Sequence, residues 1–119
     1  MGTDSVRTLR VWQDGMTLVK QSYALTRAWP KSELFGLTGQ IRRAAVSIPS
    51  NLAEGKGRGN AAELVRFARI ALGSAYALGT LLEIATELEY SSRPELLAIR
   101  ERLSSLVRQL SAFIQSRRS

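Results

Sequence analysis

Apolar residues recur every three or four positions along most of this chain, and three short interruptions divide the pattern into four segments. This spacing places apolar side chains on one face of an α-helix, because each residue turns the helix by about 100°. Clusters of proline, glycine and serine mark the interruptions. The pattern predicts an all-α fold, an up-down-up-down four-helix bundle that forms one domain over residues 1–119. The predicted helices cover about 6–28, 33–55, 61–90 and 94–115.

The same periodicity predicts which face of each helix enters the core. On the first helix it favours Trp12, Met16, Val19 and Tyr23. On the second it favours Leu34, Leu37, Ile41, Ala44, Ala45, Ile48 and Leu52. The third helix presents Leu64, Phe67, Ala68, Ala71, Ala75, Leu78, Leu82 and Ala85, and the fourth presents Leu96, Ile99, Leu103, Leu106, Leu110 and Phe113.

Two of the helices carry a second apolar stripe, which a monomeric bundle does not need. Extended apolar surface of this kind more often marks a protein interface, although a loop or the C-terminal segment could cover one of the stripes. We therefore predict a homo-oligomer. Its interface residues are predicted to be Val11, Leu18 and Leu25 on the first helix and Ile70, Leu81, Ile84 and Leu88 on the third.

A polar stripe runs beside the core face of the second helix. Its members, each three or four residues from the next, are Gln40, Arg43, Ser47, Asn51, Glu54 and Arg58. Pro49 removes a backbone donor within this helix, and we expect a kink there. The stripe fits either a capped surface helix or a surface that faces a partner. We interpret the glycines at 55, 57 and 59 as a turn. They follow a helix, and they are not followed by the lysine and serine or threonine of a phosphate-binding loop.

Several motifs together resemble one known family. They are LRVWQ at 9–13, WPKSELFGL at 29–37, QIRRAAVSIPSNLAEGKGR at 40–58 and FARIALGSAYAL at 67–78. They are similar to the bacterial four-helix bundle family that includes the intervening-sequence proteins encoded within large-subunit ribosomal RNA genes, and to the accessory variability determinant of diversity-generating retroelements. The resemblance implies a homopentameric ring, an association with nucleic acid and no catalytic activity. We interpret the family motif as structural; its residues here are Gln40, Arg43, Ser47, Pro49, Asn51, Glu54 and Gly55.

The chain departs from the family pattern on the third helix. Where members of the family carry two glutamates and a glutamine, this chain has Ala77, Gly79 and Leu81. If those polar groups contribute to contacts between subunits, apolar surface has replaced them here.

Composition argues against an enzyme. The chain has no cysteine and no histidine, which removes disulfides, thiolate nucleophiles, the usual zinc sites and the side chain best suited to proton transfer near neutral pH. The best catalytic candidate, Glu54 near Ser47 and Asn51, lacks a base that would activate the serine. We predict no catalytic residues, no metal and no cofactor. With no apolar run of about 18 residues and no secretory signal, we also expect a cytoplasmic protein without a membrane role.

Charge suggests the partner. The chain has seventeen basic residues, fourteen of them arginine, and ten acidic residues, which gives a net charge of +7. Arginine matches phosphate geometry, but a high-GC genome produces the same bias, and we weigh the two explanations equally. The candidate nucleic-acid-binding residues are Arg42, Arg43, Lys56, Arg58, Arg66, Arg69, Arg100, Arg102 and Arg108. A joint patch of Arg42, Arg43, Arg100 and Arg108 would suit RNA or DNA. The alternative is a protein-binding scaffold whose charge is incidental.

Overall fold

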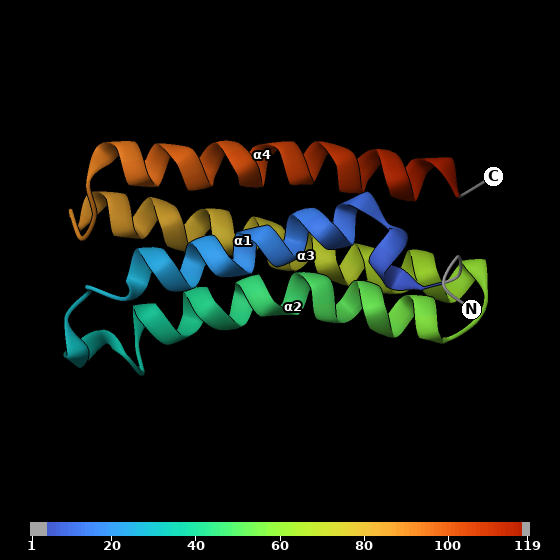
Figure 1. Ribbon diagram of the computed structural model, residues 1–119, viewed down its shortest axis with the longest axis horizontal. Helices are drawn as coiled ribbons and strands as arrows, with labels where there is room; N and C mark the ends of the chain where they lie inside the picture. Colours follow the sequence, from blue (N-terminus) through green and yellow to red (C-terminus); the bar gives the residue numbers. More distant parts are fainter. Residues whose placement is uncertain (1–4, 118–119) are drawn as a thin grey trace.

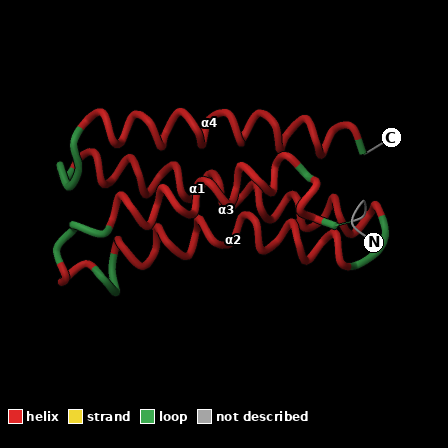
Figure 2. The backbone as a smooth tube through the Cα atoms, in the orientation of Figure 1, coloured by secondary structure: helices red, strands yellow, loops and turns green. Residues whose placement is uncertain are grey.

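The computed structural model describes residues 5–117, which form an antiparallel four-helix bundle about 43 Å long (Figure 1). The helices are α1 (Arg10–Thr26), α2 (Leu37–Gly57), α3 (Ala61–Glu87) and α4 (Arg93–Ser116), with short 3-10 helices η2 (Val6–Thr8) and η3 (Lys31–Glu33). Figure 2 shows that helices and short loops account for the described part of the chain, which contains no strand. The all-α four-helix bundle is therefore confirmed.

The helix ends follow local chemistry. The Asn60 side chain caps α3 by accepting from the backbone N–H of Glu63, and Ser92 and Glu95 form a reciprocal capping box at the start of α4. Three predicted boundaries were wrong by three or four residues, among them the end of the third helix, which lies at Glu87 and not at residue 90. The first helix is shorter because the chain before Arg10 forms η2. The second begins at Leu37 because Lys31–Glu33 closes a separate 3-10 turn, and the Glu33 carboxylate accepts from the Leu37 N–H at 3.1 Å.

The core stripe of α3 is confirmed in full, since all eight predicted residues are buried. By length and composition α3 could also cross a bilayer, as the core helix of a bundle often can, but here its buried residues pack inside the bundle. On α4 the last core position is Ile114 rather than Phe113, which is only partly buried. On α2 the core begins at Leu37, and Leu34 lies exposed before the helix starts.

The predicted orientation of α1 was wrong. Val11, Leu18 and Leu25, predicted as an oligomer interface, are buried in the core, whereas Met16 and Tyr23 are 37% and 40% exposed. The buried face also contains Gly15 and Ser22. A Cβ at Gly15 would lie 3.4 Å from Ile48 and Pro49, so the small residues let α1 approach α2 closely. Of the predicted stripe, Met16 and Tyr23 are therefore exposed, and Trp12 and Val19 are only partly buried at the edge of the core.

Pro49 lies inside α2, which continues as a helix to Gly57. Its ring is buried against α1, beside Gly15. The helix therefore accommodates the proline without ending. The kink itself stays a prediction.

Candidate nucleic-acid interface

One end of the bundle carries most of the unbalanced positive charge. Here α2 turns into α3, and the first and last described residues lie at the same end of the bundle (Figure 1). We call residues 5–10, 54–69 and 113–117 the basic end. Its basic side chains are Arg7, Arg10, Lys56, Arg58, Arg66, Arg69 and Arg117. Seven basic groups against two carboxylates, Glu54 and Glu63, give a formal net charge of +5.

Aromatic rings hold several of these arginines in place. The guanidinium carbons of Arg58 and Arg66 lie 5.0 and 4.4 Å from the ring centre of Phe67. Arg7 lies over Trp12 at 5.6 Å, and Arg117 lies over Phe113 at 3.8 Å. Stacking restricts the side chains while the N–H groups at the guanidinium edge stay able to donate. The basic end therefore presents partly ordered donors suited to an anion.

The turn itself brings α2 and α3 into unusually close contact. Gly55, predicted as the last residue of the second helix and the first glycine of the turn, is a buried helical residue, and a Cβ there would lie 2.7 Å from the Phe67 Cβ and 3.2 Å from the Leu64 Cα. The turn is made further on, where Gly59 has a φ of +84° that favours glycine. A shallow pocket of about 500 Å³ at this turn is lined in part by Lys56 and Asn60.

Ion pairs neutralise only part of the basic end. Arg66 Nε donates to Glu63 Oε2 at 3.0 Å; this hydrogen bond lowers the pKa of Glu63 and raises the pKa of Arg66. Arg58 donates to Glu54 at 2.9 Å. Within residues 5–117, Lys56 and Arg69 form no ion pair. These two cations can therefore meet an incoming phosphate without displacing a carboxylate.

The opposite end has the opposite charge. We call residues 27–36 and 83–97 the connection end, where α1 joins α2 and α3 joins α4. Its charged residues are Arg27, Lys31 and Arg93 against Glu33, Glu83, Glu87, Glu89 and Glu95, which gives a formal net charge of −2. Charge is therefore segregated along the long axis of the bundle.

Hydrogen-bonded aromatic rings join the two connections at this end. Tyr90 Oη donates to Glu33 at 2.7 Å, and Trp29 Nε1 donates to Ser91 Oγ at 2.6 Å. The Trp29 and Tyr90 rings lie 5.3 Å apart. The bond from Tyr90, with a second from the Leu37 N–H, lowers the pKa of Glu33, and the same bond to Glu33 raises the pKa of Tyr90. The Glu33 carboxylate therefore helps to hold the two connections together.

The predicted joint patch on the second and fourth helices does not form. Each of α2 and α4 packs against α1 and α3, and the two lie diagonally across the bundle. Arg42 stacks over Tyr23 at 4.5 Å and donates to Thr26. The α4 arginines then diverge, because Arg100 pairs with Glu83 of α3 whereas Arg102 approaches Asp14 of α1. Arg42 and Arg43 thus lie on a different side of the bundle from Arg100 and Arg108.

The polar stripe of α2 runs along its seam with α3. Ser47 and Ser74 share a hydrogen bond of 2.7 Å between their hydroxyl oxygens, and Asn51 Nδ2 donates to the carbonyl and the hydroxyl of Ser47. Glu54 accepts from Arg58 on the same helix. The contacts of Ser47 and Asn51 are partly buried between α2 and α3, whereas the Glu54–Arg58 pair is exposed, and together they give these members of the family motif a structural explanation. Gln40 and Arg43 remain exposed.

The second apolar stripe of α3 lies on the surface, as its sequence pattern predicts. Ile70 and Ile84 are each 42% exposed, Leu88 is half exposed, and Leu81 is partly buried. By helical arithmetic the stripe flanks the α2 seam, because Leu81 lies seven residues after Ser74. The α3 half of the predicted interface is therefore available for contact, while the α1 half is not.

Sequence reasoning missed part of the basic end. Arg7, Arg10 and Arg117 were not among the candidates, because only the antiparallel topology brings them to the same end of the bundle as the α2–α3 turn. Among the described residues no group of three or more carboxylates could hold a metal ion.

The sequence profile of the 23S rRNA-intervening sequence protein family matches residues 7–112. A comparison with curated proteins gives no significant match. Among solved structures, a protein of unknown function from the S23 ribosomal protein family of Bacteroides thetaiotaomicron superposes with a TM-score of 0.81 at 22% identity, over 88% of this chain and 95% of that chain. That similarity supports the fold.

Proposed function

This chain belongs to the 23S rRNA-intervening sequence protein family, and from that premise we propose that it is a non-enzymatic, self-associating, cytoplasmic helical bundle that binds RNA or DNA through its basic end. The observation that carries this proposal is the segregation of charge, +5 at the basic end against −2 at the connection end, or +4 against −1 when Asp14 and Arg100, the ion-pair partners of Arg10 and Glu83, are counted as well. A protein that used positive charge only for solubility would have no reason to collect it at one end.

The physics of the interaction is phosphate neutralisation. Each phosphate contact from lysine or arginine releases condensed counterions, so affinity falls log-linearly with salt. Among the described residues Lys56 and Arg69 form no ion pair, and the Arg58 and Arg66 guanidinium groups are stacked over Phe67. Such contacts recognise the nucleic-acid backbone and supply little sequence specificity. The protein then acts as an accessory that holds a nucleic acid for another factor.

Self-association would multiply these contacts. The exposed stripe of α3 offers apolar surface for a subunit interface, and the family resemblance favours a homopentameric ring. A ring presents several basic ends to one polymer, which converts weak contacts into useful avidity. Light scattering at micromolar concentration tests this part. The mass of an oligomer, shifted towards the monomer by Ile84→Arg, supports it, and a monomer mass for the natural chain contradicts it.

A protein-binding scaffold is the second candidate, and one observation favours it. The exposed stripe of α3 lies beside the hydrogen-bonded seam with α2, a combination of apolar and polar surface that suits protein contacts. In that case the positive charge is incidental.

Fluorescence anisotropy distinguishes the two functions. Labelled structured RNA, single-stranded DNA and duplex DNA are titrated with the purified protein at several salt concentrations. Binding that weakens log-linearly with salt supports the nucleic-acid accessory, and a difference among the probes indicates which polymer it prefers. Absence of binding at low salt overturns the proposal and leaves the scaffold.

A further inference from the structure

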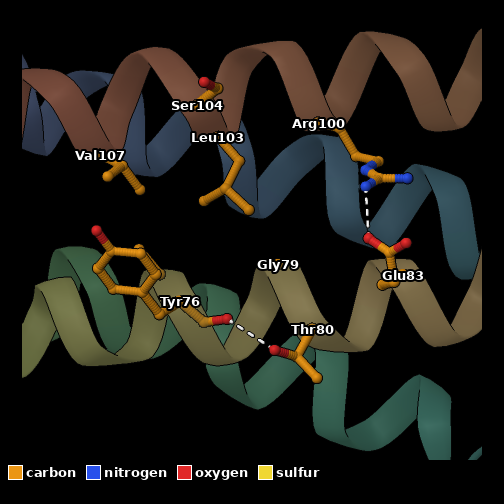
Figure 3. Close-up of a pocket in the computed structure, with 9 residues that line it drawn as sticks. Tyr76, Gly79, Thr80, Glu83, Arg100, Leu103, Ser104 and Val107 are labelled. Carbon is orange, nitrogen blue, oxygen red and sulfur yellow. Dashed lines mark hydrogen bonds and ion pairs between the residues drawn. The ribbon is translucent and has the colours of Figure 1, made fainter.

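A groove of about 450 Å³ separates α3 from α4 near the middle of the bundle (Figure 3). Its floor includes Gly79, Leu103 and Val107. A Cβ at Gly79 would meet only the Leu103 side chain, at 3.6 Å, so the absence of a side chain there leaves the groove open. The volume falls within the range of about 300–1,000 Å³ that is typical of ligand sites.

Tyr76 is the prominent side chain of this groove. It is 62% exposed, and Figure 3 shows its ring directed towards α4, opposite Val107. No side-chain hydrogen bond or aromatic contact holds this ring within the described residues. An exposed aromatic face beside an apolar floor is a stacking platform for a planar group.

The rims of the groove differ in charge along its length. At one end Arg100 donates to Glu83 at 2.6 Å and closes the groove with an ion pair. Towards the other end, Arg108 donates to Ser104, which lines the groove, at 2.9 Å. Arg69 lies two helical turns before Tyr76 and so on nearly the same face of α3, in the direction of the basic end. The Tyr76 half of the groove therefore continues into the positive surface.

We propose that this groove binds a single-stranded segment of RNA or DNA, with one unpaired base stacked on Tyr76 and the adjoining phosphates beside Arg108 and Arg69. The inference rests on the proposed function and names a second, base-stacking site for the same ligand. A duplex does not fit, because its bases are stacked on one another and their faces are not free for an aromatic side chain. The Glu83 carboxylate would repel a phosphate, so it marks the limit of the binding site at the end of the groove away from the basic surface.

The ring is tested by Tyr76→Ala, with Tyr76→Phe as the matched control that keeps the aromatic face. Tyr76→Ala should weaken binding of a labelled single-stranded oligonucleotide about tenfold and leave duplex affinity unchanged, and Tyr76→Phe should bind both probes normally. Normal single-strand binding by Tyr76→Ala overturns the groove site, while salt-dependent binding by the natural chain still upholds the basic end. If the natural chain binds neither probe, the proposed function fails as well.

The charge is tested by Glu83→Gln, which removes a carboxylate from the track and releases Arg100 towards phosphate. We expect single-strand affinity to rise severalfold. A fall instead indicates that Glu83 attracts a cationic occupant, such as a basic helix of another protein, and overturns the proposal. Light scattering completes the test: an unchanged mass for Tyr76→Ala is expected, and loss of assembly identifies the groove as a subunit contact and overturns the nucleic-acid site.

Discussion

The two ends of the bundle carry opposite net charges, and different contacts stabilise the fold at each end. At the connection end, carboxylates take part in the fold, as Glu33 accepts from Tyr90 and Glu95 completes the capping box of α4. At the basic end, close backbone contact at Gly55 and rings such as Phe67 hold the structure, and the cations around them are only partly paired. Part of the positive charge at the basic end is therefore not taken up by ion pairs within the described residues, which is why we assign it to function.

The close contact between α2 and α3 at Gly55, at the basic end, should give the largest change in the free energy of unfolding. Gly55→Ala places a methyl group against Phe67 and the backbone of Leu64, and we expect it to lower the free energy of unfolding by about 1–3 kcal/mol. Gly57→Ala is the control, since no atom of the described residues beyond its own helix lies within 4 Å of its Cβ position, and better helix propensity should stabilise the protein by about 0.5 kcal/mol. Urea unfolding measures both. Equal effects would mean that α2 and α3 are not in close contact here.

The helix caps at the two ends should contribute equally to the free energy of unfolding. Asn60→Ala removes the cap of α3 at the basic end, and Ser92→Ala removes the cap of α4 at the connection end. Each should cost about 1 kcal/mol in the same urea experiment, because each leaves a backbone N–H without its partner. A loss confined to one variant would show that one turn carries most of the stability.

The pair of Tyr90 and Glu33 should give the connection end a pH signature. The folded pKa of Glu33 is lowered from 4.5, so its contribution is present above pH 4.5 and is lost as pH falls through the folded value. The folded pKa of Tyr90 is raised from 10.0, so its contribution is present below pH 10.0 and is lost as pH rises further. Tyr90→Phe should therefore lower the melting temperature most between these limits. A difference that is constant from pH 3 to pH 11 would argue against the bond.

Removing one carboxylate from the basic end should have the smallest effect on stability. Glu54→Gln breaks an exposed ion pair with Arg58 and should change the free energy of unfolding by no more than about 0.5 kcal/mol. Because Arg58 is released, nucleic-acid affinity should rise about twofold to threefold. Glu87→Gln at the connection end makes the same change in net charge and should leave affinity unaltered. Anisotropy at constant salt compares the two, and an equal gain in both would refute a localised site.

Much of the fold could be predicted from sequence because the apolar periodicity is strong where small and large apolar residues lie on the same stripe of a helix. On α3, alanines and leucines share one stripe, and that stripe is the core. On α1 two stripes compete, and the bulkier residues, such as Trp12 and Tyr23, suggested the wrong face. The buried face contains Gly15 and Ser22, whose small size is what permits close approach to α2. Which of the two α1 stripes is buried depends on how closely α2 packs against it, and the sequence of α1 alone does not show that.

The candidate site was predicted in part for a related reason. Lys56, Arg58, Arg66 and Arg69 are close in sequence, so their cluster is visible without a structure. The contributions of Arg7 and Arg117 depend on topology, which returns distant segments to one end. The same topology separates Arg42 from Arg100, since α2 and α4 are diagonal, and a linear sequence contains no sign of that separation.

The most direct test compares two triple variants that each lower the net charge by three. One replaces Lys56, Arg66 and Arg69 at the basic end by glutamine, and the other replaces Arg27, Lys31 and Arg93 at the connection end. Anisotropy with the tightest-binding probe is measured against salt for both. The basic-end variant should lose about fivefold to eightfold in affinity per lost contact at 0.1 M salt, with a shallower salt dependence, while the connection-end variant binds like the natural chain. Equal losses in the two variants would contradict a nucleic-acid interface at the basic end.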